Sequence, residues 1–119
     1  MPKQLLEYNQ LFHALADPTR RAVIERLGQG SASASQLMTP FSMALPSFMQ
    51  HLSVLEQSGL VHSVKVGRVR IYRLEPEAIQ QIQNWLSQQR LIWEQRLDQL
   101  DQYLSSSVFN PQGEKNDQL

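Results

Sequence analysis

Apolar residues in the first 60 positions recur three and four residues apart, which is the spacing of amphipathic helices. Asp17 and Pro18 fit an N-cap and a first helical position, and one of the serines at 31–35 should cap a short helix. The pattern predicts four helices: one at about residues 2–15, one from 18 to a glycine at 28 or 30, a short one around 37–38 that Pro40 ends, and one from about 45–46 to Gly59.

The pattern changes its period after Gly59. Apolar and polar residues now alternate on either side of Gly67 and Arg68, which predicts a β-hairpin that turns at this pair. The alternating apolar positions are Val64, Val66, Val69 and Ile71. Two helices joined by a short turn and followed by a hairpin have the order of a winged helix-turn-helix, a mainly α fold with the β-hairpin as its wing.

A long last helix should begin at residues 75–77. It carries apolar residues seven positions apart, with Ile82 and Tyr103 on the same stripe: Ile79, Leu86, Trp93 and Leu100. Because such a stripe would be a large apolar patch on a single chain, we expect a second copy to cover it. Residues 1–104 then form one domain for DNA binding and dimerisation, and the polar residues 105–119 form a disordered tail.

The composition narrows the class of protein. The 119 residues suit one domain with a thin core, which favours an oligomer. Cysteine is absent, so disulfides and thiolate metal sites are excluded. No stretch approaches the roughly 18 apolar residues of a membrane span, and no signal segment is apparent, so we expect a cytoplasmic protein. Nucleophile, histidine–carboxylate and glycine-rich phosphate motifs are also missing from the sequence, so we expect neither an enzyme nor a cofactor.

The net charge is zero, but the charge is unevenly distributed. Residues 18–74 contain seven basic side chains and two acidic ones, whereas residues 75–119 contain three basic and seven acidic ones. Between Gln57 and Leu74 there is no acidic residue at all. A basic middle segment in a neutral chain is typical of a surface that binds a polyanion such as DNA.

The hairpin gives this interpretation its main support. With a turn at Gly67 and Arg68, Lys65 lies opposite Arg70, and like charges that face each other destabilise a sheet. The pair makes physical sense if DNA phosphates neutralise both charges in the complex. The alternative is a ribbon that is basic only for solubility. Arg20 and Arg21 lie at the start of the second helix, where they oppose the helix dipole, and we expect at least one of them to pair with Asp17 or Glu25.

The fourth helix is the candidate for the major groove. Its periodicity places Phe48 and Leu52 in the core and leaves Ser47, Gln50 and His51 pointing outward. Glutamine suits adenine edges, and serine and histidine can reach bases or phosphates. The alternative is an ordinary solvated helix face.

Three segments together resemble the ArsR family of bacterial repressors. They are residues 15–21, 46–61 and 67–74, which read LADPTRR, PSFMQHLSVLEQSGLV and GRVRIYRL. The resemblance spans about residues 8–104. It implies a homodimer, built by the first and last helices, that binds an imperfect palindrome near its own promoter. It also implies that Ser47, Gln50 and His51 occupy DNA-reading positions, and that Arg68 and Arg70 lie on the wing.

The sequence departs from the members of that family that sense metals. Their third-helix cysteines match Ser33 and Ser35, and hydroxyls are poor ligands for soft metals. The last helix has no histidine, so Glu94 and Asp98 fit a solvated acidic face better than a weak cation site. The histidines, His13, His51 and His62, lie on separate elements without ligand spacing. No metal site is therefore expected.

The closest similarity is to the metal-free branch of the family, with tryptophans on the last helix. Trp85 and Trp93 could line an effector pocket, but the dimer core is the favoured place for them. The identity of any effector, small molecule or protein, stays open.

The sequence therefore predicts a repressor that binds double-stranded DNA as a homodimer. A protein-interaction module that docks a partner through its last helix is the alternative. The expected DNA-binding residues are Ser47, Gln50, His51, Ser53, Lys65, Arg68 and Arg70. The expected dimer interface consists of Tyr8, Leu11, Phe12, Ile79, Ile82, Leu86, Trp93 and Leu100.

Overall fold

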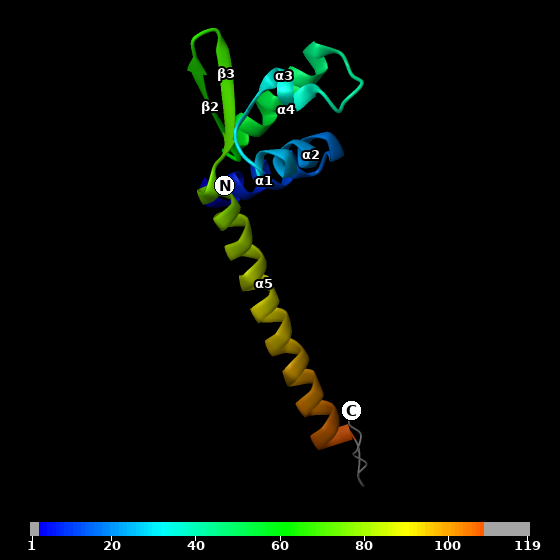
Figure 1. The fold of residues 1–119 in the computed structure, drawn as a ribbon. Coiled ribbons are helices and arrows are strands. Elements are labelled where there is room, and N and C mark those ends of the chain that lie inside the picture. Colours follow the sequence, from blue (N-terminus) through cyan, green and yellow to red (C-terminus); the bar gives the residue numbers. More distant parts are fainter. Residues whose placement is uncertain (1–2, 109–119) are drawn as a thin grey trace. The chain divides into compact units, whose positions relative to one another are not determined.

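A computed structural model describes residues 3–108 of the chain (Figure 1). The four helices expected in the first 60 residues are confirmed, as are the hairpin and the long last helix. The helices are α1 (Lys3–Leu15), α2 (Pro18–Leu27), α3 (Ala34–Met38), α4 (Leu45–Ser58) and α5 (Pro76–Tyr103). The strands are β1 (Ala32–Ser33), β2 (Val61–Val66) and β3 (Val69–Leu74), and a π-helical segment, η1 (Leu104–Val108), follows α5.

Side chains at the helix ends explain these boundaries. The Asp17 carboxylate accepts a hydrogen bond of 3.0 Å from the Arg20 amide and so caps α2 ahead of Pro18. Ser33 and Gln36 form a capping box at α3, with bonds of 3.2 and 2.9 Å. At the end of α4, Gly59 adopts a left-handed conformation with φ of 88°, which glycine allows without steric cost.

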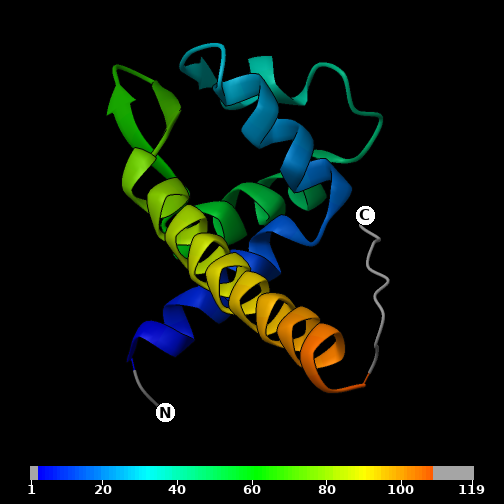
Figure 2. The same ribbon diagram turned by 90° about the horizontal axis from the view of Figure 1, so that it is seen from below.

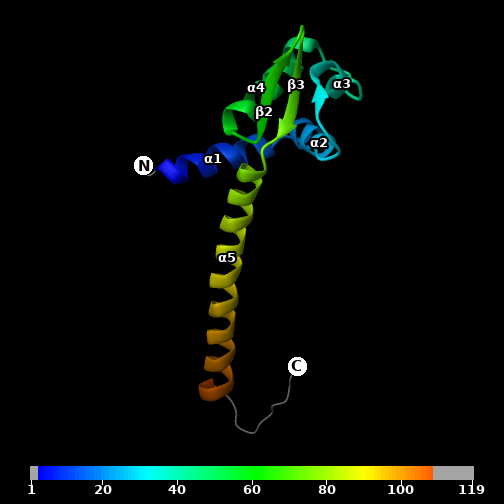
Figure 3. The ribbon, with the colours of Figure 1, turned by 60° about the vertical axis from the view of Figure 1, so that its left-hand side comes forward.

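The hairpin belongs to a three-stranded antiparallel sheet in the order β1–β3–β2. Lys65 pairs with Arg70, as predicted, and Gly67 takes the φ of 65° that the tight turn requires. β1, a two-residue strand in which Ala32 pairs with Tyr72, was not predicted. The turn between β2 and β3 lies at the end of the hairpin far from α1 (Figure 2 and Figure 3).

The core gathers around α4. Phe48, Leu52 and Leu55 are fully buried along one side of this helix, which packs against α1, α2, α3 and β2. Leu11 of α1 is also fully buried within the single chain. This corrects its assignment to the dimer interface, because a buried side chain offers no surface to a second copy. Tyr8, Ile79 and Ile82 are partly buried against the same core.

The chain divides into two compact units, Met1–Ile82 and Gln83–Leu119. The first contains the helix-turn-helix and the sheet. In the second, α5 exposes several large apolar side chains, among them Leu86, Trp93 and Leu100. The expected disordered tail begins at 105, but residues 104–108 are helical, and 109–119 lie outside the described residues. No helix in the described part has the length and apolarity that crossing a membrane requires.

Candidate nucleic-acid interface

The side of α4 opposite the core is polar and exposed. Ser47, Gln50 and Ser53 all lie there, as the helical period requires once Phe48 and Leu52 point inward. The Ser53 hydroxyl accepts a long hydrogen bond of 3.4 Å from the side-chain amide of Gln57, one turn later in α4. These side chains are hydrogen-bonding groups of the kind that read base edges and phosphates.

Lys65 and Arg70 lie on the face of the hairpin that packs against α4. Paired residues of an antiparallel ribbon share a face, and the face of Lys65 and Arg70 continues that of Ser63 and Tyr72, which are buried against the core. Arg68 lies in the turn. In the described part of the chain, neither Lys65 nor Arg68 forms an ion pair. Both charges are therefore open to an external anion.

Arg70 is held by the protein itself. Its Nη1 donates to the Ser63 hydroxyl at 3.0 Å, and this hydroxyl donates to the Glu56 carboxylate of α4 at 2.5 Å. Burial, together with the Glu56 charge, raises the pKa of the neighbouring Tyr72 hydroxyl, while Arg70 acts in the opposite sense. The relay joins the wing to α4 and leaves Arg70 without a direct ion pair. It was not predicted, because Glu56 lies outside the acid-free stretch.

Arg73 differs from the other cations of the hairpin. It lies on the opposite face of the ribbon, and its Nη1 contacts the Glu75 carboxylate at 2.7 Å. This arginine is thus neutralised within the chain. It contributes to the basic count of the sequence but not to the open charge of the wing.

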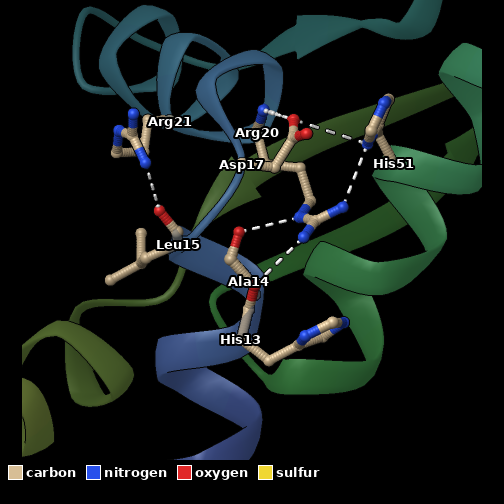
Figure 4. A network of polar contacts seen from close by, with 7 residues as sticks. All are labelled: His13, Ala14, Leu15, Asp17, Arg20, Arg21 and His51. Atoms are coloured by element: carbon tan, nitrogen blue, oxygen red, sulfur yellow. Dashed lines mark hydrogen bonds and ion pairs between the residues drawn. The ribbon is translucent and has the colours of Figure 1, made fainter.

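His51 does not share the exposure of its neighbours on α4. Its side chain is 22% exposed, and its Nδ1 lies 3.1 Å from Nη1 of Arg20 and 3.7 Å from the Asp17 carboxylate (Figure 4). The expectation that His51 simply points outward is therefore wrong. The ring lies at the flank of α4, against the start of α2.

The side chains of Arg20 and Arg21 hydrogen-bond to the end of α1 and, among the described residues, form no ion pair with Asp17 or Glu25, although the charge of Arg20 lowers the pKa of Asp17. Arg20 donates from Nε to the Ala14 carbonyl at 2.8 Å and from Nη2 to the His13 carbonyl at 3.0 Å (Figure 4). Arg21 donates to the Leu15 carbonyl at 2.8 Å. Cations at a helix C-terminus satisfy free carbonyls and complement the dipole. At the start of α2 these two cations oppose the dipole of that helix, but they also lie at the C-terminus of α1, where their charge is favourable.

Comparison with known proteins agrees with this architecture. A helix-turn-helix domain family matches residues 15–64. The transcriptional repressor SdpR of Bacillus subtilis is 31% identical over 78 residues, which cover 66% of this chain and 87% of that protein. A crystal structure of an ArsR family transcriptional regulator is 48% identical and has a TM-score of 0.74, with 79% of this chain and 97% of that one covered. The chain belongs to the ArsR family.

Other relatives support the same conclusion. An ArsR-like transcriptional regulator from Rhodococcus sp. RHA1 is 33% identical, with a TM-score of 0.76, and the match covers 86% of this chain and 96% of that structure. The ArsR family consists of DNA-binding transcriptional regulators with a winged helix-turn-helix, not of enzymes. In this chain, α3 and α4 form the helix-turn-helix and the β2–β3 hairpin forms the wing.

Ser33 and Glu94, which were compared above with metal ligands of ArsR family members, have other contacts in this chain. The Ser33 hydroxyl caps α3, and the Glu94 carboxylate lies 3.9 Å from Arg90 in an exposed pair. Among the described residues, no three histidine, aspartate or glutamate side chains gather in one place. Ser35 is exposed at the start of α3 and is not part of the capping box.

The Asp17 carboxylate caps α2 and also lies close to the His51 ring. Burial acts to raise the pKa of this carboxyl, but the hydrogen bond from the Arg20 amide and the charges of His51 and Arg20 outweigh it, so the pKa lies below its ordinary 3.8. A carboxylate with a lowered pKa stabilises the fold at pH values above 3.8. This contribution is lost as the pH falls through the lowered pKa.

We expect Asp17→Ala to lower the free energy of unfolding by about 1 kcal/mol at neutral pH, because the N-cap is removed. Below pH 3.8 the difference from the wild type should shrink, since the wild-type carboxyl is then increasingly protonated. Urea denaturation at neutral pH and below pH 3.8 measures this difference in the free energy of unfolding. Asp17→Asn is the control, because asparagine caps helices but does not titrate. An equal loss for alanine at both pH values would contradict the role of the charge.

Proposed function

We propose that this protein represses transcription by binding a palindromic operator as a homodimer, with α4 in the major groove and the wing against the phosphates. The observation that carries the proposal is the set of open cations on the wing, on the ribbon face that packs against α4. The exposed hydroxyl and amide groups of Ser47, Gln50 and Ser53 supply hydrogen-bonding partners for base edges. Relatives named as repressors, such as SdpR, support repression and not activation.

The homodimer is supported by the composition of α5. Leu86, Trp93 and Leu100 are 52, 65 and 50% exposed in the single chain and fall seven residues apart. A second copy would remove this apolar surface from water. The Mb0332 domain of Mycobacterium bovis, which shares the fold at 22% identity and a TM-score of 0.57, is homodimeric.

We further propose that repression does not depend on a metal ion and that the protein acts in the cytoplasm. The Ser33 hydroxyl is used by the capping box, and hydroxyls bind soft metals poorly.

The double variant Lys65→Ala/Arg68→Ala tests the role of the wing. We expect weaker binding to the DNA upstream of the chain's own gene, because two phosphate contacts are lost in each protomer of the proposed homodimer. The slope of log K against log salt concentration should flatten by about 3.6, at roughly 0.9 for each of the four contacts. Fluorescence anisotropy titrations at several salt concentrations measure both quantities.

Arg73→Ala is the matched control for this experiment. Arg73 lies on the same hairpin but pairs with Glu75, so its loss should leave the slope unchanged. A double variant with wild-type affinity and slope would remove the wing from the proposal. If the wild type itself causes no change in anisotropy at a micromolar dimer concentration, the alternative of a docking module is favoured. The exposed apolar residues of α5 would then be its surface.

A further inference from the structure

We propose that Arg20 is a positioning residue that fixes the tautomer of His51, so that His51 meets DNA only as a hydrogen-bond donor. The inference rests on the proposed function in one respect, namely that α4 lies against DNA. It specifies which groups on DNA the His51 side chain can contact.

The first step concerns the proton on the ring. A guanidinium group has five N–H donors and no acceptor. Nη1 of Arg20 lies 3.1 Å from Nδ1 of His51, and a hydrogen bond between them requires Nδ1 to offer its lone pair. The neutral ring then carries its proton on Nε2. The Asp17 carboxylate, at 3.7 Å from Nδ1, is too distant to hydrogen-bond to a proton there.

The second step concerns the rigidity of Arg20. Only 8% of this residue is exposed, and its Nε and Nη2 are engaged by the carbonyls of Ala14 and His13. The guanidinium is thus fixed by the end of α1 and presents its remaining edge to α4 (Figure 4). Turning it away from His51 would break hydrogen bonds between a buried cation and the backbone, which are costly to lose.

The third step concerns the DNA. With Nδ1 occupied, the only polar group that His51 can offer is Nε2–H, and the ring retains partial exposure. Phosphate oxygens, purine N7, guanine O6 and thymine O4 accept hydrogen bonds, whereas cytosine N4 and adenine N6 donate them. His51 can therefore pair with an acceptor on a phosphate or a base, but a base-edge donor in the same place would meet another donor.

The tautomer can be measured directly in the full-length protein. With the ring in its neutral form, two-dimensional NMR of the ring nitrogens should show His51 protonated on Nε2 with an unprotonated Nδ1. The exposed His62 serves as a reference in the same spectrum. In Arg20→Met, a form protonated on Nδ1 should appear. A wild-type ring protonated on Nδ1 would overturn the proposal.

Because Arg20→Met removes a buried group and can fail to fold, two variants of His51 provide an independent test. Asparagine can accept from Arg20 at the position of Nδ1 but does not reach the position of Nε2, whereas the glutamine amide does. We expect His51→Asn to weaken operator binding about tenfold, and His51→Gln to retain more of the affinity. Equal losses in the two variants, or none, would contradict a donor at Nε2.

Modified operators distinguish the two sources of acceptor. Methylphosphonate substitution neutralises single phosphates, and base analogues that lack N7, guanine O6 or thymine O4 remove single base acceptors. At one position, one of these changes should weaken the wild type but not His51→Asn. If every modified operator affects both proteins equally, His51 donates to neither group and the proposal fails. Failure of the proposed function would look different, because the wild type would then bind no operator, while the NMR result would still report the tautomer.

Discussion

Replacing Trp93 and Leu100 together by glutamate should convert the protein to a monomer and lower its operator affinity by about 100-fold or more. The two side chains are 65 and 50% exposed and lie on one stripe of α5. Two charges per chain would have to be buried without partners if the interface still formed. A palindrome read by a monomer loses the gain from linking two binding events, which is about 10²- to 10⁴-fold. Sedimentation velocity and anisotropy measure the two effects.

The control is the double variant Leu91→Glu/Gln95→Glu. It adds the same two charges to the same helix, but the 3.6-residue period places them on the opposite side from the stripe. We expect it to remain a dimer and to bind DNA as the wild type does. A dimer in Trp93→Glu/Leu100→Glu would show that a different surface joins the copies. A monomer with unchanged affinity would show that dimerisation is not needed for binding.

The elements that the sequence predicted well are those with local signals. Asp17 before Pro18 marks the start of α2, and Gly59 marks the end of α4, because each effect acts within one turn of the chain. The hairpin register followed from the turn at Gly67, since a two-residue turn fixes which residues pair. The face of the hairpin on which each cation lies could therefore be derived without a structure, whereas the contacts of Arg70 and Arg73 within the chain could not.

The features that the sequence did not predict depend on contacts between distant residues. β1 has two residues and no periodicity, and it exists because β3 provides a free edge for Ala32. Leu11 fits both a core and an interface by periodicity, and only packing decides between them. Arg20 and His51 are 31 residues apart, and no pattern in either segment indicates that one orients the other.

Replacing Phe48 by alanine should lower the free energy of unfolding by about 3–5 kcal/mol. Phe48 is fully buried, and its ring centroid lies 5.5 Å from that of Phe41 at an angle of 35°. The cavity would open beneath the exposed face of α4, between this helix and the segment that precedes it. Chemical denaturation at one fixed protein concentration measures the loss, since the stability of the proposed dimer would depend on concentration.

Met49→Ala is the control, because this neighbouring side chain is 38% exposed and its loss should cost far less. A loss below about 1 kcal/mol for Phe48→Ala would mean that the core refills the cavity. The two variants also separate stability from recognition. If Phe48→Ala binds DNA normally while folded, the core serves only to keep α4 in place; if it binds weakly at temperatures where it is fully folded, the packing of Phe48 also sets the orientation of the exposed face.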